Sequence, residues 1–152
     1  MGNPNEHPEQ AVRKFESMLQ TDDVYFFDSE DFEEIIHHYL NIGKTLLAKR
    51  ALAMGKEQHP HAIELKLLEV EILVSEDRFE KAQILIEDIE AYDPLNEELF
   101  VQKANILSKK EDHIGAIALL EKALEYSEDS FDLHSLLGLE YLYIDEFEQA
   151  IP

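Results

Sequence analysis

Residues 136–150, LLGLEYLYIDEFEQA, predict two helices joined by a short turn. An apolar face at helical spacing comes first, the polar segment Ile144-Asp145-Glu146 follows as the turn, and a second apolar face then begins. Gly138 lies inside the first helix, where glycine is about 1 kcal/mol less favourable than alanine. Because a close contact between helices is the usual compensation, we expect one at Gly138.

Similar residues recur upstream of this stretch at a fixed spacing of 34. Alanine occupies four such positions, which are Ala48, Ala82, Ala116 and Ala150. Large side chains recur in the same way at Tyr39, Leu73, Leu107 and Tyr141, and the two prolines Pro60 and Pro94 share the spacing. A fixed period of this length is typical of stacked helical repeats.

The recurring residues resemble the pattern of the tetratricopeptide repeat (TPR) family, in which each unit forms two antiparallel helices. The last unit supplies Leu137, Gly138, Tyr141, Phe147 and Ala150. The earlier units supply Phe100, Ala104, Leu107, Ala116, Leu120 and Ala123, then Leu73, Phe79, Ala82, Ile86 and Pro94, and then Phe32, Tyr39, Ala48, Leu52 and Pro60. The resemblance implies an all-α superhelix, a solenoid of antiparallel helix pairs with about three and a half TPR units.

We expect an N-terminal helix and linker at residues 1–28 and a TPR array at residues 29–152, divided into 29–62, 63–96, 97–130 and a shortened 131–152. The expected helices are 8–20, 30–42, 45–58, 62–74, 78–91, 97–109, 113–126 and 131–143, with a further helix that begins at Glu146. Helix 8–20 is expected to cap the array or to occupy its groove.

Several local signals refine this organisation. Asp28 or Ser29 is expected to cap the helix that follows it, and Gly43 is expected to end that helix. Residues 24–27, Val-Tyr-Phe-Phe, are expected to form a linker with tucked aromatic side chains, with a strand as the alternative. Because the apolar face of residues 131–143 lacks a covering helix, we expect the chain to be a fragment of a longer array or to associate through this end.

The composition argues against several classes of partner. The formal net charge is −21, from 13 basic and 34 acidic residues, and such a surface repels nucleic acid and anionic membranes. No apolar run approaches the roughly 20 residues of a membrane span, and the acidic start lacks the features of a signal peptide. The absence of cysteine removes disulfide and thiolate chemistry. We expect a cytoplasmic protein.

The TPR resemblance implies that one stripe of each first helix lines a groove for a peptide. The expected binding residues are Glu30, Glu33, His37, Glu64, Leu67, Glu71, Glu98, Val101, Asn105, Ser135 and Leu139. Because the stripe is acidic at its edge and apolar inside, we expect a basic or basic-apolar protein segment as the ligand.

A structural interpretation of the same residues remains open. The first-turn acids Glu30, Glu64, Glu98 and Asp132 can each stabilise a helix by about 0.3–1 kcal/mol through its dipole. The apolar residues Leu67, Val101 and Leu139 can simply contact a neighbouring repeat. No Lys or Arg lies on the stripe, so it does not fit the carboxylate-gripping specificity known in the family.

No pattern in the sequence indicates catalysis, a metal or a cofactor. The seven histidines lack the spacing of a zinc site, and neither a nucleophile motif nor a glycine-rich phosphate loop is present. We therefore expect a non-enzymatic scaffold for protein–protein interaction. The alternative is a self-assembly module, a homo-oligomer that forms through residues 131–143.

Overall fold

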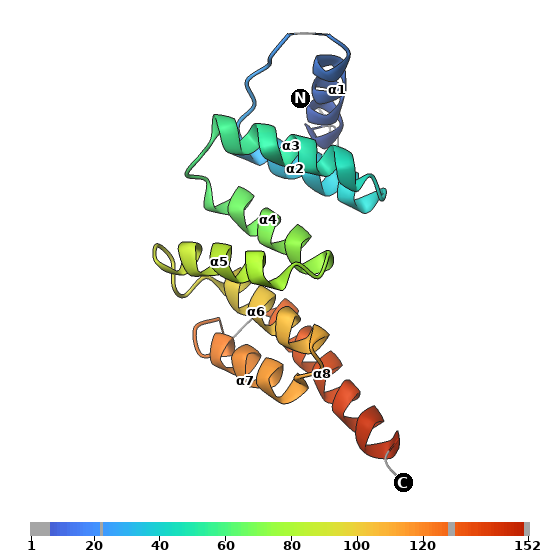
Figure 1. The fold of residues 1–152 in the computed structure, drawn as a ribbon, viewed down its shortest axis with the longest axis vertical. Coiled ribbons are helices and arrows are strands. Elements are labelled where there is room, and N and C mark those ends of the chain that lie inside the picture. The colour runs from blue at the N-terminus through green and yellow to red at the C-terminus, as the bar shows by residue number, and fades with distance from the viewer. Residues whose placement is uncertain (1–6, 22, 128–129, 151–152) are drawn as a thin grey trace. The chain divides into compact units, whose positions relative to one another are not determined.

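The computed structural model describes residues 7–21, 23–127 and 130–150, which form eight α-helices and no strand (Figure 1). The helices are α1 (His7–Gln20), α2 (Ser29–Asn41), α3 (Thr45–Gln58), α4 (Ile63–Ser75), α5 (Phe79–Glu90), α6 (Glu97–Lys109), α7 (His113–Leu124) and α8 (Phe131–Ala150). The expected all-α fold class is confirmed. Helices α1 to α7 begin and end within two residues of the predicted positions.

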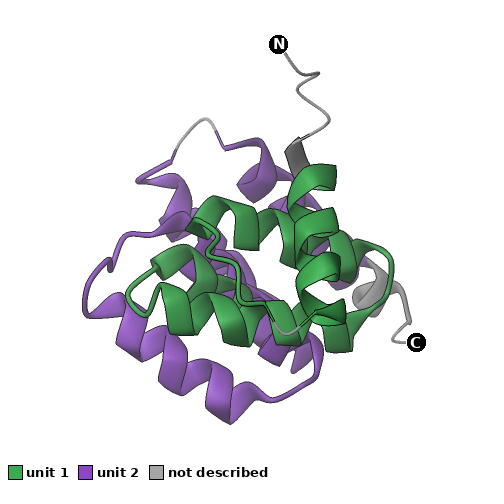
Figure 2. Cartoon of the chain, turned by 90° about the horizontal axis from the view of Figure 1, so that it is seen from above, with its two compact units in different colours: residues 1–69 green, residues 70–152 purple. Residues whose placement is uncertain are grey.

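The chain divides into two compact units, residues 1–69 and residues 70–152 (Figure 2). Unit 1 contains α1 to α3 and the beginning of α4, and unit 2 contains the end of α4 and α5 to α8. The predicted division at residue 28 and then every 34 residues concerns repeats rather than compact units, and it stays a prediction.

The core of unit 1 forms around α2. Phe32, Ile35, Ile36 and Tyr39 are all fully buried, as expected for the stripe that faces other helices. Helix α1 packs on this face through Phe15, whose ring centroid lies 5.9 Å from that of Tyr39. The Tyr39 hydroxyl donates a hydrogen bond of 3.1 Å to Glu16 on α1. Burial and this hydrogen bond together raise the pKa of Tyr39 to about 12.

Residues 24–27 form a linker, as predicted, and not a strand. Only one of its aromatic side chains is buried. Phe27 is 3% exposed and packs against Phe32, whereas Phe26 is 75% exposed. The side chain of Gln58 holds the linker backbone. Its Nε2 donates to the Tyr25 carbonyl at 2.9 Å, and its Oε1 accepts from the Phe27 amide at 3.0 Å.

Unit 2 has a core between α6, α7 and α8. Its buried side chains are Phe100, Ala104, Ala116, Ile117, Leu120, Ala123, Leu133 and Leu137. Three of the alanines at the 34-residue spacing, Ala48, Ala82 and Ala116, have no exposed surface in their respective units. The spacing therefore marks positions where the packing between helices leaves room for a methyl group and little more.

Three turns of the chain share one geometry at the same spacing. Gly43, Asp77 and Glu111 have φ angles of 76°, 60° and 64°. In each turn the next amide, from Lys44, Arg78 or Asp112, donates a 2.8 Å hydrogen bond to the carbonyl of Tyr39, Leu73 or Leu107. This pattern is the usual way to satisfy the last carbonyls of a helix. The predicted end of α2 at Gly43 is confirmed, and Asp28 is its N-terminal cap, accepting from the Asp31 amide at 2.8 Å.

The turn predicted at Ile144-Asp145-Glu146 is wrong, because α8 continues through it to Ala150. At the two preceding turns, residues of the following helix such as Ile86 and Leu120 are buried, which offsets the cost of the left-handed residue. After Ile144 the chain instead keeps the helical hydrogen-bond pattern as far as Ala150.

The close helix contact expected at Gly138 is also wrong. A Cβ atom added at Gly138 would meet nothing within 4 Å. The close approach occurs instead at Gly55 on α3, where a Cβ would lie 3.0 Å from Cγ of Phe32 and 3.1 Å from Cδ1 of Leu65. The repeat pattern pointed to the glycine that matches the family, whereas the packing in unit 1 requires a different one.

Candidate partner-binding site

In unit 1, three of the predicted binding residues are carboxylates that lie near one another and beside a histidine. We name this set the first acidic cluster: Glu30, Glu33 and His37 on α2, and Glu64 on α4. Glu30, His37 and Glu64 are exposed, and Glu33 is half-buried. Because residues 30, 33 and 37 lie on one side of α2, packing α4 beside it brings a fourth charged group to the same surface.

The pKa of Glu33 reflects the other charged groups of the first acidic cluster. Burial raises the pKa of Glu33, and the carboxylates of Glu64, Glu30 and Glu34 raise it further, while His37 lowers it. The interaction with Glu64 joins side chains from two helices that are 31 positions apart in the sequence. A cation placed here would relieve repulsion among several carboxylates at once.

Unit 2 holds a second acidic cluster, made of Glu71 on α4, Glu98 on α6 and Asp132 on α8. Burial raises the pKa of Glu98, and Glu71, Glu97 and Asp132 raise it further. Because each acid comes from a different helix, the cluster exists only in the folded unit. The sequence identifies Asp132 as a first-turn acid, and it is not among the expected binding residues.

A buried amide lies beside the second cluster. Gln102 is 3% exposed, and its Nε2 donates a 2.8 Å hydrogen bond to Oε1 of Glu98. This hydrogen bond lowers the pKa of Glu98 and partly opposes the effect of burial. Sequence reasoning missed Gln102, although its spacing of four residues from Glu98 on a helix could have indicated the contact.

The remaining predicted residues lie outside both clusters. Leu67, Val101 and Asn105 are half-buried on their helices, and Ser135 and Leu139 are exposed on α8. Val101 packs against the core of unit 2, which is the structural role that was left open for it. Leu139 is 51% exposed and has no such role. The role of all these residues in binding stays a prediction.

The side chain of Lys109 is hydrogen-bonded to the C-terminal end of α4. Its ammonium donates to the Val74 carbonyl at 2.9 Å and to Oδ1 of Asp77 at 2.8 Å. A cation at the C-terminus of α4 satisfies an otherwise open carbonyl and interacts favourably with the helix dipole. The contact joins the end of α6 to the end of α4 within unit 2. No pattern in the sequence predicts this contact.

A polar contact inside unit 2 also escaped prediction. Nδ1 of His113 on α7 lies 2.7 Å from Oε2 of Glu140 on α8, and the His113 ring stacks on Tyr143 with 5.0 Å between centroids. Glu140 is almost fully buried. These contacts fasten α8 to α7 and leave Leu139 and Leu142 exposed on α8.

Two further observations limit the chemistry of the described residues. In that part of the chain, no group of three His, Cys, Asp or Glu side chains has the arrangement of a metal site. None of the described helices is long and apolar enough to cross a lipid bilayer.

Comparison with known proteins establishes the fold alone. The chain is similar to the solved structure of MamA AMB-1, with a TM-score of 0.55 and 15% sequence identity over 96% of this chain and 85% of that chain. It is also similar to MamA MSR-1, with a TM-score of 0.55 and 16% identity over 97% and 90% of the two chains. No protein-family model and no curated protein sequence matches the chain. The chain therefore has a TPR-like fold of antiparallel helix pairs.

Proposed function

We propose that the protein is a non-enzymatic scaffold that binds a basic or basic-apolar segment of a partner protein. The observation that carries the proposal is the convergence of carboxylates from separate helices into the two acidic clusters, one in each unit. Repulsion among the carboxylates of each cluster raises the free energy of the unbound protein. A lysine or arginine from a partner would reduce this repulsion on binding.

The fold supports the same proposal. Each pair in a TPR-like fold has a first helix, and both clusters lie on such helices: α2 and α4 in unit 1, and α4, α6 and α8 in unit 2. The half-buried Leu67 on α4 adds apolar surface beside charged residues. An acidic binding surface on a chain of net charge −21 also accelerates encounter with a basic partner, by about 10- to 1,000-fold in favourable cases.

The test compares partner capture by two variants of equal charge. The site variant carries Glu33→Lys, Glu64→Lys and Glu71→Lys, and the control carries Glu57→Lys, Asp88→Lys and Glu125→Lys at exposed positions outside both clusters. Each immobilised protein is exposed to native cell extract and washed with rising salt. We expect the native chain and the control to retain a basic protein that the site variant loses.

Two outcomes would contradict the proposal. Equal capture by all three proteins would show that the clusters are not the binding surface. Equal loss from the site variant and from the control would show that the net charge alone attracts the captured proteins. Circular dichroism of both variants, with unchanged helicity, would exclude unfolding as the cause of any loss.

A second candidate function is self-assembly through α8. It is favoured by the exposure of Leu139 and Leu142, which lie on the side of α8 that is turned away from the buried Leu133 and Leu137. Light scattering over a dilution series should then show a mass that falls on dilution, and Leu139→Glu with Leu142→Glu should give the monomer throughout. A native chain that is monomeric at high concentration would rule this candidate out.

A further inference from the structure

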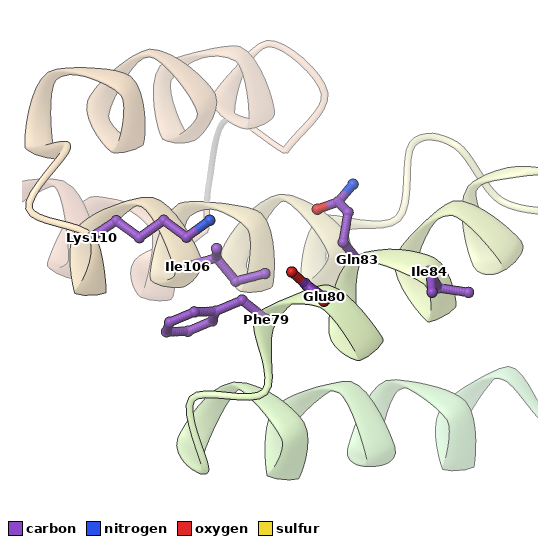
Figure 3. A pocket seen from close by; sticks show the side chains of 6 residues that line it. All are labelled: Phe79, Glu80, Gln83, Ile84, Ile106 and Lys110. Atoms are coloured by element: carbon purple, nitrogen blue, oxygen red, sulfur yellow. The ribbon is translucent and has the colours of Figure 1, made fainter.

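A pocket of about 350 Å³ lies in unit 2, at the beginning of α5 and the end of α6. Its apolar part consists of Phe79, Ile84 and Ile106, and Figure 3 shows Ile106 pointing from α6 toward Phe79, with the Lys110 side chain extended beside it. The volume falls in the range of roughly 300–1,000 Å³ that is usual for ligand sites. An adjoining hollow extends it past Arg78 and Lys81.

The rim of this pocket is basic although the chain is strongly acidic. Arg78, Lys81 and Lys110 are exposed there and account for three of the chain's 13 basic residues. The opposing charges in the lining are Asp77 and Glu80. Asp77 already accepts a hydrogen bond from Lys109 at 2.8 Å, so Glu80 is the acid that remains to balance the three cations.

The apolar part and the cations form one surface. The ammonium of Lys110 lies 5.4 Å from the centroid of the Phe79 ring, a distance at which the cation is attracted to the ring face. Phe79 is half-buried and Ile84 is 69% exposed. An apolar group entering the pocket would therefore contact Phe79 and Ile84 while remaining within reach of positive charge.

The backbone at this place also favours negative charge. Arg78 occupies the position before α5, and its side chain makes no capping hydrogen bond. The first turn of α5, which lines the pocket, keeps amide groups that no side chain at the cap satisfies. Together with the helix dipole they add to the attraction that the three cations exert on an anionic group, and Glu80 offsets only part of it.

We propose that this basic-rimmed pocket, formed by Phe79, Ile84 and Ile106 with Arg78, Lys81 and Lys110, binds an acidic segment of a partner protein that carries a large apolar side chain. The apolar side chain contacts Phe79 and Ile84, and neighbouring carboxylates pair with the cations. The pocket has the opposite charge preference to the acidic clusters, and its role does not depend on theirs. The scaffold would then hold two kinds of segment at once.

The test uses a short fluorescein-labelled peptide in which one phenylalanine is flanked by glutamates, and binding is followed by fluorescence anisotropy at low ionic strength. The pocket variant combines Arg78→Glu with Lys110→Glu. Its matched control combines Arg13→Glu with Lys14→Glu on the exposed side of α1, which changes the net charge equally. We expect the pocket variant to raise the Kd about tenfold or more and the control to leave it within about twofold.

A second pair of measurements tests the apolar contact. Ile84→Ser removes an exposed apolar side chain without disturbing the core, and it should weaken binding of the phenylalanine peptide by about three- to tenfold. The same peptide with serine in place of phenylalanine should bind the native chain more weakly than the original does. Circular dichroism of each variant, with native helicity, shows that the fold is kept.

Several outcomes would overturn the proposal. The native chain does not bind the peptide, or the pocket variant and its control weaken binding equally, which indicates general repulsion. Equal binding of the serine peptide indicates a simple anion site. A native chain whose mass rises with concentration, and whose pocket variant is monomeric in light scattering, shows instead that a second copy occupies the pocket.

Discussion

Glu111 is the turn residue least suited to its conformation. Its φ angle is 64°, in the left-handed region where a side chain costs about 1–2 kcal/mol and where glycine is free of the penalty. Glu111→Gly should therefore raise the free energy of unfolding by about 0.5–1 kcal/mol, after the greater freedom of glycine in the unfolded chain is counted. Urea denaturation measures the change.

Gly43 provides the reciprocal control for this prediction. Its φ angle is 76°, and an added Cβ would meet nothing within 4 Å, so Gly43→Ala changes backbone strain without a clash. It should lower the free energy of unfolding by about 1 kcal/mol. A loss of stability in Glu111→Gly would contradict the idea that the turns are equivalent.

The two helical glycines should respond to alanine with opposite signs. Gly138→Ala should stabilise the protein by about 1 kcal/mol, because the helix gains a better former and the new methyl group meets open space. Gly55→Ala should destabilise it, because the methyl group would lie 3.0 Å from Cγ of Phe32. Thermal unfolding of the two variants gives the comparison. Destabilisation by Gly138→Ala would mean that this side of α8 is covered in solution.

Among the elements, the linker before α2 depends on one side chain of α3. Gln58→Ala removes both hydrogen bonds that its amide makes with Tyr25 and Phe27, each of which contributes about 0.5–1.5 kcal/mol. We expect faster hydrogen exchange at the Phe27 amide, with α2 and α3 unchanged. Gln58→Glu keeps an acceptor for that amide and should protect it better than alanine does. Equal protection in all three proteins would show that Gln58 is not what protects the Phe27 amide.

Helix positions could be predicted because most of the first seven helices have an apolar face and a recognisable start or stop. Helix α4 is apolar on most sides, so its bounds followed from Pro60 before it and from Ser75-Glu76-Asp77 after it. The end of α2 followed from Gly43, since glycine favours the left-handed residue that ends a helix. The continuation of α8 could not be predicted this way. Asp145 has the same place in the repeat as Asp77 and Glu111, yet the backbone turns only where a following helix is buried. That balance depends on packing and not on local sequence.

The candidate site was predictable in part for the same reason. A spacing of 34 residues placed Glu64, Glu98 and Asp132 at equal positions on successive first helices, so the neighbourhood of Glu98 and Asp132 followed from the repeat. Gln102 and the Lys109 contact with Val74 depend on how far a side chain reaches between helices. The basic-rimmed pocket depends on the gap left between α5 and α6, which no spacing in the sequence encodes.

For the molecule as a whole, acidification should first increase stability. The pKa values of Glu33 and Glu98 are raised in the folded protein, chiefly by burial and then by neighbouring carboxylates. The folded state therefore binds more protons than the unfolded state just above the ordinary glutamate range, and stability falls as pH rises through that window. As the pH is lowered from neutrality toward the ordinary glutamate range of about 4.3, the free energy of unfolding should increase.

Urea denaturation at several pH values measures this dependence, and Glu98→Gln provides the control. Glutamine keeps the shape of the side chain and removes its charge, so the slope of stability against pH should become shallower. If stability instead fell steadily as the pH was lowered from neutrality, Glu33 and Glu98 would not govern the response. Added salt should flatten the slope as well, because it screens repulsion among the exposed acids that surround them.

The three left-handed turn residues also bear on how such a chain can change over generations. Glycine codons become aspartate or glutamate codons through a single change at the second base, and Gly43, Asp77 and Glu111 are one residue of each kind. Each replacement costs about 1 kcal/mol, a modest part of the roughly 5–15 kcal/mol that holds a domain folded. A turn can therefore lose its glycine by one nucleotide substitution and keep its backbone conformation. The geometry of the repeat is then retained although the glycine that marks it in the sequence is gone.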